Sequence, residues 1–153
     1  FGGHMYAAGM TLKEENYLAL KNAFEKEVEK TIHPDLLIPE ISIDDEIELS
    51  DINERLIRIL NQFEPFGPQN MTPVFMAKGV KDTGYGKTIG QNDEHLKLFV
   101  KQNNSEGFGV IGFSLGNKLD LTKNQNPFDI AFCIDENEFN GNVTVQLRLK
   151  DLR

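Results

Sequence analysis

The spacing of apolar residues changes once along this chain, from helical in the first part to alternating in the second. Four apolar side chains recur at the spacing of one helix face: Tyr17, Leu20, Phe24 and Val28. Thr11 and Glu14 have the spacing of a capping box, in which each side chain bonds the backbone N–H of the other residue. The pattern therefore predicts a helix from Thr11 to about Lys30.

A second helix is predicted after a stretch that proline interrupts. Residues 36–43 are mostly apolar but contain Pro39, which cannot donate to a strand ladder and so favours an edge strand. Ser50 is a typical N-cap residue. Five apolar side chains then repeat at helical spacing and define a side expected to be buried: Ile52, Leu56, Ile59, Leu60 and Phe63. We expect this helix to span residues 51–62.

The segment Pro65-Phe66-Gly67-Pro68 ends the helical pattern, because proline and glycine both disfavour a continued helix. A stiff turn is predicted here, and it leads into the first strand. Phe63 and Phe66 are expected to be buried where the second helix meets the strands. We place the boundary between two modules near residue 65.

The remaining sequence predicts a small antiparallel β-barrel. Short alternating segments separated by turn residues lie at about 74–81, 85–90, 95–102, 108–114, 128–134 and 142–150. The OB-fold, a five-stranded Greek-key barrel, has the right size. Residues 115–125 are then its connecting helix or loop. The predicted fold class is α+β, with two helices followed by this barrel.

Two of these strands present polar side chains on one face. In 95–101, Leu96, Leu98 and Val100 alternate with His95, Lys97, Phe99 and Lys101. In 143–150, Val143, Val145, Leu147 and Leu149 are expected to face inward, and Thr144, Gln146, Arg148 and Lys150 outward. An aromatic ring between two lysines suits a stacked base and its phosphates. An ordinary amphipathic sheet has the same alternation, so both interpretations remain open.

The net charge of −8 argues against nucleic-acid binding, for which a basic patch is typical. The acidity is uneven, however. Residues 1–63 hold 6 Lys or Arg against 13 Asp or Glu, a net −7, whereas residues 64–153 hold 10 against 11, a net −1. The second part can therefore still form a locally basic groove.

Several other kinds of chemistry are disfavoured. No apolar run reaches the roughly 20 residues that span a bilayer. The lone Cys133 excludes an internal disulfide, fits a cytoplasmic protein, and lies in an apolar strand where a packed thiol is expected. Gly86-Lys87-Thr88 resembles the end of a Walker A motif, but Lys81 stands where that motif needs glycine. A glycine-rich hairpin is predicted instead, with Tyr85 and Lys87 at the barrel rim.

The first residues form a glycine-rich motif, Phe1-Gly2-Gly3-His4-Met5-Tyr6-Ala7-Ala8-Gly9. Its two glycines let the backbone approach a ligand, and an imidazole beside them can donate to a phosphate oxygen. Gly-His-Met is also what a cloning tag leaves behind. The Ala-Ala-Gly continuation and the later Pro-Phe-Gly turn favour a motif of the protein itself.

Together, this motif and the segment Glu64-Pro65-Phe66-Gly67-Pro68-Gln69-Asn70 resemble the RecJ-type exonucleases of the DHH phosphoesterase superfamily. The resemblance covers nearly the whole chain. It implies a piece of a longer protein: residues 1–64 would end a DHH-associated domain, and residues 65–153 would form a nucleic-acid-binding OB-fold. The parent would be a 5′-to-3′ exonuclease of DNA repair and recombination, specific for single-stranded DNA.

The resemblance also implies where the chemistry lies. The parent would hold Mn²⁺ or Mg²⁺ in an N-terminal domain with an Asp-His-His motif. His4, His33 and His95 are not adjacent, so we expect no metal site and no complete catalytic site here, only a phosphate contact at His4. The expected DNA-binding residues are Gly2, Gly3, His4, Tyr85, Lys87, Lys97, Phe99, Lys101 and Arg148.

Two other functions fit the same residues. The barrel can be a protein-docking module that binds no nucleic acid, which suits the acidic first part and a barrel of nearly neutral charge. A phosphodiesterase acting on small nucleotides is the third candidate, but such substrates need no strand-tracking groove. Expected partners are single-stranded DNA and proteins of the repair machinery, without a membrane.

Overall fold

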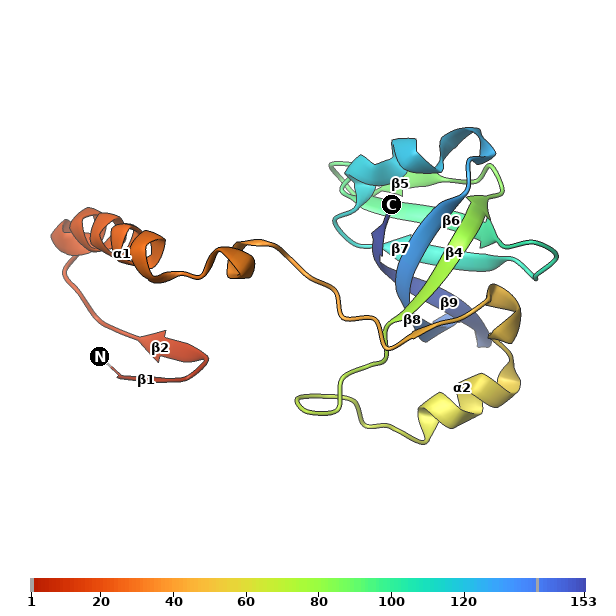
Figure 1. The fold of residues 1–153 in the computed structure, drawn as a ribbon, viewed down its shortest axis with the longest axis horizontal. Coiled ribbons are helices and arrows are strands. Elements are labelled where there is room, and N and C mark those ends of the chain that lie inside the picture. Colours follow the sequence, from red (N-terminus) through yellow and green to blue (C-terminus); the bar gives the residue numbers. More distant parts are fainter. Residues whose placement is uncertain (1, 140) are drawn as a thin grey trace. The chain divides into compact units, whose positions relative to one another are not determined.

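The computed structural model describes residues 2–139 and 141–153, in two compact units (Figure 1). The first unit ends at Glu40, and the second is Ile41–Arg153. The second unit therefore begins before residue 65, where the sequence places the boundary. The assignment of residues 1–64 to a DHH-associated domain stays a prediction.

The first unit contains a small hairpin and one long helix. Strand β1 (Gly2–His4) pairs antiparallel with β2 (Ala7–Gly9). A 3₁₀ turn, η1 (Glu14–Asn16), precedes helix α1 (Tyr17–Thr31). The prediction that the helix begins at Thr11 is wrong, because Glu14–Asn16 adopt the tighter turn and no side chain caps α1.

The edge strand predicted over residues 36–43 is also absent from the described structure. A 3₁₀ turn, η2 (Pro34–Leu37), takes its first half. Pro34 suits the first turn of a helix because it has no N–H to leave unpaired. The side chain of His33 accepts a hydrogen bond from Asp35 N–H at 3.4 Å and so caps this turn.

In the second unit, a short strand and two helical segments precede the main sheet. They are β3 (Asp45–Glu46), the 3₁₀ turn η3 (Leu49–Asp51) and helix α2 (Glu54–Asn61). The N-cap of α2 is Asn53 and not Ser50, because Asn53 Oδ1 accepts from the N–H groups of Arg55 and Leu56 at 3.0 and 3.1 Å. The predicted helix 51–62 is therefore shorter at its start.

Only part of the predicted apolar side of α2 is buried. Ile52 is buried and Leu56 and Leu60 pack partly against the core. Ile59 is 41% exposed and Phe63 is 59% exposed, so the expectation that these two side chains are buried is wrong. Helix α2 ends at Asn61, and the chain turns before Phe63 can follow the helical period.

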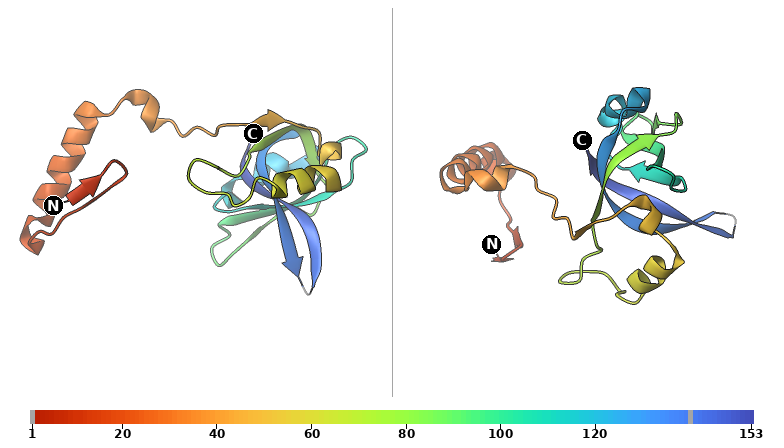
Figure 2. Two further views of the ribbon diagram at one scale, coloured as in Figure 1. Left: turned by 90° about the horizontal axis from the view of Figure 1, so that it is seen from below. Right: turned by 45° about the vertical axis from the view of Figure 1, so that its right-hand side comes forward.

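The six strands expected in the second module are confirmed. They are β4 (Phe75–Asp82), β5 (Lys87–Ile89), β6 (His95–Lys101), β7 (Phe108–Gly112), β8 (Phe128–Phe139) and β9 (Asn142–Leu152). Residues 115–125 form the expected short connection, a 3₁₀ segment η4 (Gly116–Gln125). In the second unit, η4 and α2 lie at opposite ends of the sheet (Figures 1 and 2).

The strands form one seven-stranded sheet in the order β3-β4-β8-β9-β7-β6-β5. An additional pairing between β4 and β6 closes this sheet on itself around an apolar core. Most neighbours are antiparallel, but β3 with β4 and β7 with β9 run parallel. The core is drawn from β4, β6, β7, β8, β9 and η3, and its fully buried side chains include Leu49, Leu96, Phe132 and Leu147.

The hairpin of β8 and β9 extends beyond the rest of the barrel (Figure 2). Val143, expected to face inward, is 59% exposed there. The alternation of apolar and polar residues in β9 includes Val143, but the apolar core does not extend as far as this residue. The expected burial of Leu147 and Leu149 is confirmed, because these residues lie where the barrel is closed.

The Pro-Phe-Gly turn is stabilised by one amide side chain. Asn70 Nδ2 donates to the carbonyl oxygens of Phe63 and Pro65 at 2.8 and 3.0 Å, and Gly67 and Asn70 exchange both backbone hydrogen bonds. Phe66 is half-buried. The turn is therefore ordered by Asn70 as well as by its prolines.

One surface ion pair should make stability depend on pH. Burial alone would raise the pKa of Asp151, but hydrogen bonds from Lys118 Nζ and Leu152 N–H, with the charge of Lys118, lower it. A carboxyl whose pKa is lowered by folding stabilises the fold above its unfolded pKa of about 3.9, and this contribution disappears as pH falls through the folded value. We expect Lys118→Met to lower the melting temperature more at pH 7 than in acid, where Asp151 is protonated and only the hydrogen bond from Lys118 Nζ to the Leu152 carbonyl oxygen, at 3.0 Å, is still lost. A loss of the same size at pH 7 and in acid would contradict this origin.

None of the helices in the described residues is long and apolar enough to cross a membrane.

Candidate nucleic-acid interface

A groove of about 670 Å³ runs between the β4–β5 loop and strands β6 and β7. It brings together four of the residues that the sequence marks for DNA binding, from two separate segments. Its lining consists of Gly84, Tyr85, Gly86, Lys87, Lys97, Leu98, Phe99 and Gly109. This groove is the candidate nucleic-acid interface.

The alternation predicted for strand β6 is confirmed. Leu96, Leu98 and Val100 are at most 2% exposed and belong to the core. Lys97 and Lys101 are exposed, and Phe99 lies between them with 38% of its surface exposed. The strand therefore presents one aromatic ring and two ammonium groups on the face away from the core.

Asp82, the last residue of β4, and Thr83, which follows it, tie the loop to strand β6. Asp82 is only 6% exposed; its Oδ2 accepts from Gly84 and Gly86 N–H at 2.8 and 3.0 Å, and its Oδ1 from Phe99 N–H at 3.2 Å. Thr83 donates to Phe99 carbonyl oxygen through both its N–H and its Oγ1, each at 2.9 Å. The loop that carries Tyr85 and the strand that carries Phe99 are thus held together before any ligand arrives.

Glycines lie next to both aromatic side chains of the groove, with a different role at each. Gly109 is the β7 partner of Phe99, and a Cβ at Gly107 would come within 2.2 Å of the Phe99 ring. The ring therefore rests against the backbone at Gly107. Tyr85 is 74% exposed on a loop where Gly84 has a φ of +96°, which favours glycine.

The sheet beside the groove sets like charges opposite each other. Lys87 is the register partner of Lys97 across β5 and β6, and Lys81 is the partner of Lys101 across β4 and β6. Like charges directly opposite on neighbouring strands destabilise a sheet. Within the described part of the chain, none of these four lysines has a carboxylate oxygen within 4.0 Å. The arrangement is therefore suited to an anionic ligand.

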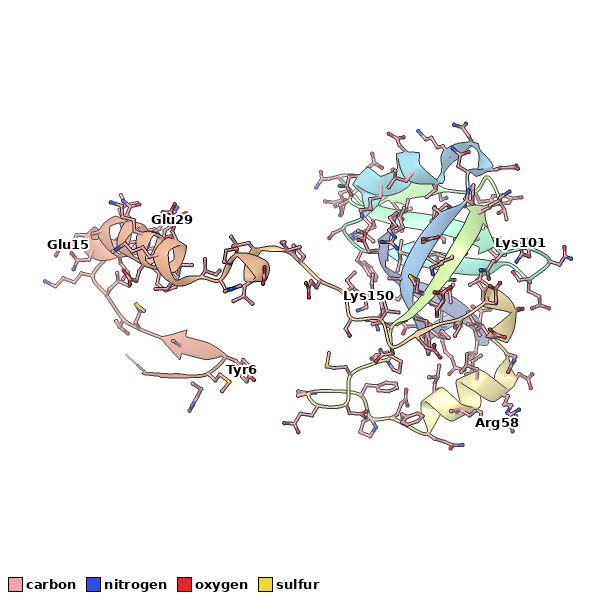
Figure 3. All side chains as sticks on the ribbon, viewed as in Figure 1. Tyr6, Glu15, Glu29, Arg58, Lys101 and Lys150 are labelled. Atoms are coloured by element: carbon pink, nitrogen blue, oxygen red, sulfur yellow. The ribbon has the colours of Figure 1, made fainter. Side chains whose placement is uncertain are left out.

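Within the second unit, two of the predicted DNA-binding residues lie outside the groove lining. Lys101 is the last residue of β6 (Figure 3). It is the partner of Lys81 across β4 and β6 and is not among the residues that line the groove. Arg148 forms an ion pair with Asp135, with Nε 2.8 Å from Oδ2. This pairing leaves Arg148 less available to a phosphate than Lys97, which has no such partner among the described residues.

Gly2, Gly3 and His4 form strand β1 of the first unit, and all three are exposed. The structure therefore leaves their expected contact with phosphate as a prediction. His95 lies at the start of β6, where its Nδ1 accepts from Ser114 N–H at 3.1 Å and its ring meets Phe113 edge-on at 5.2 Å. One ring nitrogen of His95 therefore has its hydrogen-bond partner within the protein.

The remaining candidate chemistry is structural. Gly86-Lys87-Thr88 leads into β5 and not into a helix, which agrees with the rejection of a Walker A motif. The predicted hairpin is not formed, because β4 and β5 each pair with β6 and not with each other. Cys133 is buried, and burial raises the pKa of its thiol, as expected for a packed side chain. In the described part of the chain, no three His, Cys, Asp or Glu residues are grouped so that they could hold a metal ion.

Two residues of the interface are missed by the sequence patterns. Asp82 faces inward and is buried although it is a carboxylate, and it organises the loop. Lys81 precedes it and is exposed opposite Lys101. The alternation of β4 could have placed Lys81 on the outer face, whereas its partner across the sheet follows only from the β4–β6 pairing.

Comparison with known proteins gives consistent relatives. The chain is 30% identical over 151 residues to the single-stranded-DNA-specific exonuclease RecJ of Bacillus subtilis, covering 99% of this chain and 19% of that protein. It is 24% identical over 156 residues to RecJ of Escherichia coli, covering 99% of this chain and 26% of that one. The chain thus spans only about a fifth to a quarter of the length of these relatives.

A solved structure shares the fold. The crystal structure of RecJ in complex with Mn²⁺ from Thermus thermophilus matches with a TM-score of 0.65 and 25% identity, over 99% of this chain and 21% of that one. The family described as the RecJ OB domain matches residues 43–151, which is most of the chain and includes the whole groove. This chain therefore belongs to the RecJ OB domain family.

Proposed function

We propose that this chain is the DNA-binding C-terminal portion of a 5′-to-3′ exonuclease of DNA repair and recombination, acting on single-stranded DNA. In this proposal the OB domain grips the strand and guides it to a phosphodiesterase site in a domain that precedes it. The observation that carries the proposal is the groove in which Tyr85, Phe99, Lys87 and Lys97 converge. The relatives, which are single-stranded-DNA-specific exonucleases by name, support it.

The groove has the two components that single-stranded DNA needs. Tyr85 and Phe99 are exposed aromatic rings on which bases can stack, and stacking does not depend on base identity. Lys87 and Lys97 lie opposite each other without carboxylate partners among the described residues, so a phosphate between them would relieve their repulsion. Binding without strong sequence preference is expected.

Binding should depend on salt and on one ring. With Lys87, Lys97 and Lys101 available, we expect two or three phosphate contacts and a slope of log K against log salt of about −1.4 to −2.1, at about −0.7 per phosphate. Phe99→Ala should weaken binding by about 1–3 kcal/mol if a base stacks on the ring. Fluorescence anisotropy of a labelled oligothymidine measures both quantities.

The matched controls lie on the same protein. Lys97→Ala should reduce the slope by about 0.7, whereas Lys123→Ala, which removes an exposed lysine paired with Asp120, should leave it unchanged. Binding by the wild type without salt dependence, or unchanged affinity of Phe99→Ala, would exclude this groove. The protein-docking function would then be favoured.

Hydrolysis is assigned to the parent enzyme and not to this chain. Mn²⁺ and Mg²⁺ accompany the T. thermophilus RecJ structures, but the described residues of this chain offer no group of three metal ligands. No step of the reaction is therefore assigned to these residues. His4, with Gly2 and Gly3, is proposed only as a phosphate contact.

The isolated chain should release no nucleotides from single-stranded DNA with either Mn²⁺ or Mg²⁺. The reason is that the expected Asp-His-His site belongs to another domain. The measurement is release of acid-soluble label from a 5′-labelled oligonucleotide, with a commercial exonuclease as the positive control. Metal-dependent release that follows the purified chain through gel filtration would contradict the assignment.

A further inference from the structure

A second groove, of about 400 Å³, lies between helix α2, the Pro-Phe-Gly turn and strand β8. It shares no lining residue with the candidate nucleic-acid interface. Its apolar lining includes Ile57 and Leu60 of α2, Phe66 of the turn, Phe75 of β4 and Ile134 of β8. Ile57, Phe66 and Ile134 are only half-buried, so their exposed parts remain available to a ligand.

Carboxylates surround this apolar floor. Glu64, Asp135 and Glu136 all line the groove, and no lysine or arginine does. Asp135 is paired with Arg148, whereas Glu64 and Glu136 are exposed and have no cation within 4.0 Å in the described structure. DNA phosphates would be repelled here, and a ligand with positive charge is favoured.

The groove also contains an open sheet edge. Strand β4 pairs with β8 only as far as Phe75 with Phe132. From Ile134 to Asn137, β8 pairs with β9 on one side, and among the described residues no strand pairs with it on the other. Pro73, just before β4, has no N–H and cannot continue the ladder. The backbone groups of 134–137 on that side are therefore available to an added strand.

We propose that this groove is a docking site for an extended peptide of a partner protein, with lysine or arginine alternating with apolar residues. The peptide adds as a strand along 134–137, an established mode of peptide recognition. Its apolar side chains contact Ile57, Phe66 and Ile134, and its cations approach Glu64 and Glu136. The open sheet edge favours a peptide in extended form. The apolar floor of the groove favours apolar side chains in this peptide, and the unpaired carboxylates of Glu64 and Glu136 favour positively charged ones.

The probe is a fluorescein-labelled peptide with the sequence Lys-Val-Lys-Val-Lys-Val, measured by anisotropy. We expect it to bind, and expect the Glu-Val-Glu-Val-Glu-Val peptide not to bind. A Lys-Val peptide N-methylated at alternate residues should bind at least tenfold more weakly, because it cannot form the added ladder. In spectra of ¹⁵N-labelled protein, the amide signals of residues 134–137 should shift on addition of the Lys-Val peptide.

Charge reversal provides the matched test. Glu64→Lys with Glu136→Lys should weaken binding of the Lys-Val peptide about fivefold, the equivalent of about 1 kcal/mol for two exposed charge contacts. Glu29→Lys with Glu40→Lys changes the net charge equally on the first unit, at exposed positions, and should leave binding unchanged. Phe99→Ala should also leave it unchanged, which separates this site from the DNA groove.

Three results would overturn the proposal. One is equal binding by the N-methylated peptide, which excludes strand addition. Another is equal weakening by the two pairs of charge reversals, which indicates nonspecific attraction. The third is a shift of the amides of 134–137 by oligothymidine and not by the peptide, which would make this edge a nucleic-acid surface.

Discussion

Replacing Gln102 by methionine should lower the free energy of unfolding by about 2–4 kcal/mol, because two buried hydrogen bonds lose their partner. Gln102 is 5% exposed, accepts from Leu49 N–H at 2.6 Å and donates to the carbonyl oxygen of Lys78 at 2.7 Å. It therefore joins η3 to strands β4 and β6. Methionine has nearly the same shape but can satisfy neither group. Urea unfolding followed by circular dichroism measures the change.

The matched control is Gln91→Met. Gln91 is exposed in the turn between β5 and β6, so this substitution should change stability by less than about 0.5 kcal/mol. A loss below about 1 kcal/mol for Gln102→Met would mean that water replaces both partners. In that case η3 would not be held to the barrel by this side chain.

Asp82→Ala should both destabilise the barrel and weaken binding of single-stranded DNA. Three backbone N–H groups, those of Gly84, Gly86 and Phe99, lose the carboxylate that accepts from them. Hydrogen bonds to a charged group contribute about 1.5–3 kcal/mol each but are not additive, so we expect a loss of about 2–4 kcal/mol in total. The loop with Tyr85 is then no longer fixed beside Phe99.

The direction of the change in DNA affinity distinguishes a positioning role of Asp82 from a purely electrostatic one. Removing a carboxylate near Lys87 and Lys97 would strengthen DNA binding if only electrostatics mattered. We expect weaker binding instead, about three- to tenfold, measured by anisotropy at a temperature where the variant is fully folded. Asp82→Asn should be intermediate in both properties, since it keeps one acceptor oxygen. Asp120→Ala, at an exposed site on η4, is the control for charge.

Tighter binding by folded Asp82→Ala would contradict the positioning role. It would show that the loop reaches its place without the carboxylate. Unchanged stability of Asp82→Ala would separately contradict the hydrogen-bond argument, because the three N–H groups would then be satisfied by water. The two readouts therefore test two different claims about the same side chain.

The uneven charge of this chain has a structural counterpart. A net charge of −8 argues against DNA binding as long as the charge is taken as uniform. In the folded barrel, part of this charge is gathered into two local groups. Lys81, Lys87, Lys97 and Lys101 gather around β6, while Glu64, Asp135 and Glu136 surround the second groove. One small domain can thus present a surface for phosphates and another for cations.

Much of the candidate site could be predicted from the sequence. The alternation in residues 95–101 places Lys97 and Phe99 on the outer face because adjacent side chains in a strand point to opposite sides. This interpretation rests on local backbone geometry, which neighbouring residues dictate, and it is confirmed. Gly84 and Gly86 around Tyr85 indicated a hairpin, which is not formed, because β4 and β5 each pair with β6 and not with each other.

Element boundaries and burial near the helices could not be predicted. Thr11 and Ser50 have the residue types of N-caps, yet the helices begin after short 3₁₀ turns at Glu14–Asn16 and Leu49–Asp51. Phe63 continues the helical period but lies beyond the last turn of α2. Several conformations satisfy the same local preferences at these positions, and packing selects among them.

By itself, the sequence determined the strand segments, the face of β6 and the resemblance to the RecJ family, because each depends on short-range spacing or on a local motif. Only the tertiary structure decided which distant residues meet. Asp82 meets Phe99, Lys81 meets Lys101 and Gln102 meets Leu49 through pairings between strands or loops far apart in the chain. Such contacts depend on sheet order and register, and no periodicity within a single segment encodes either of them.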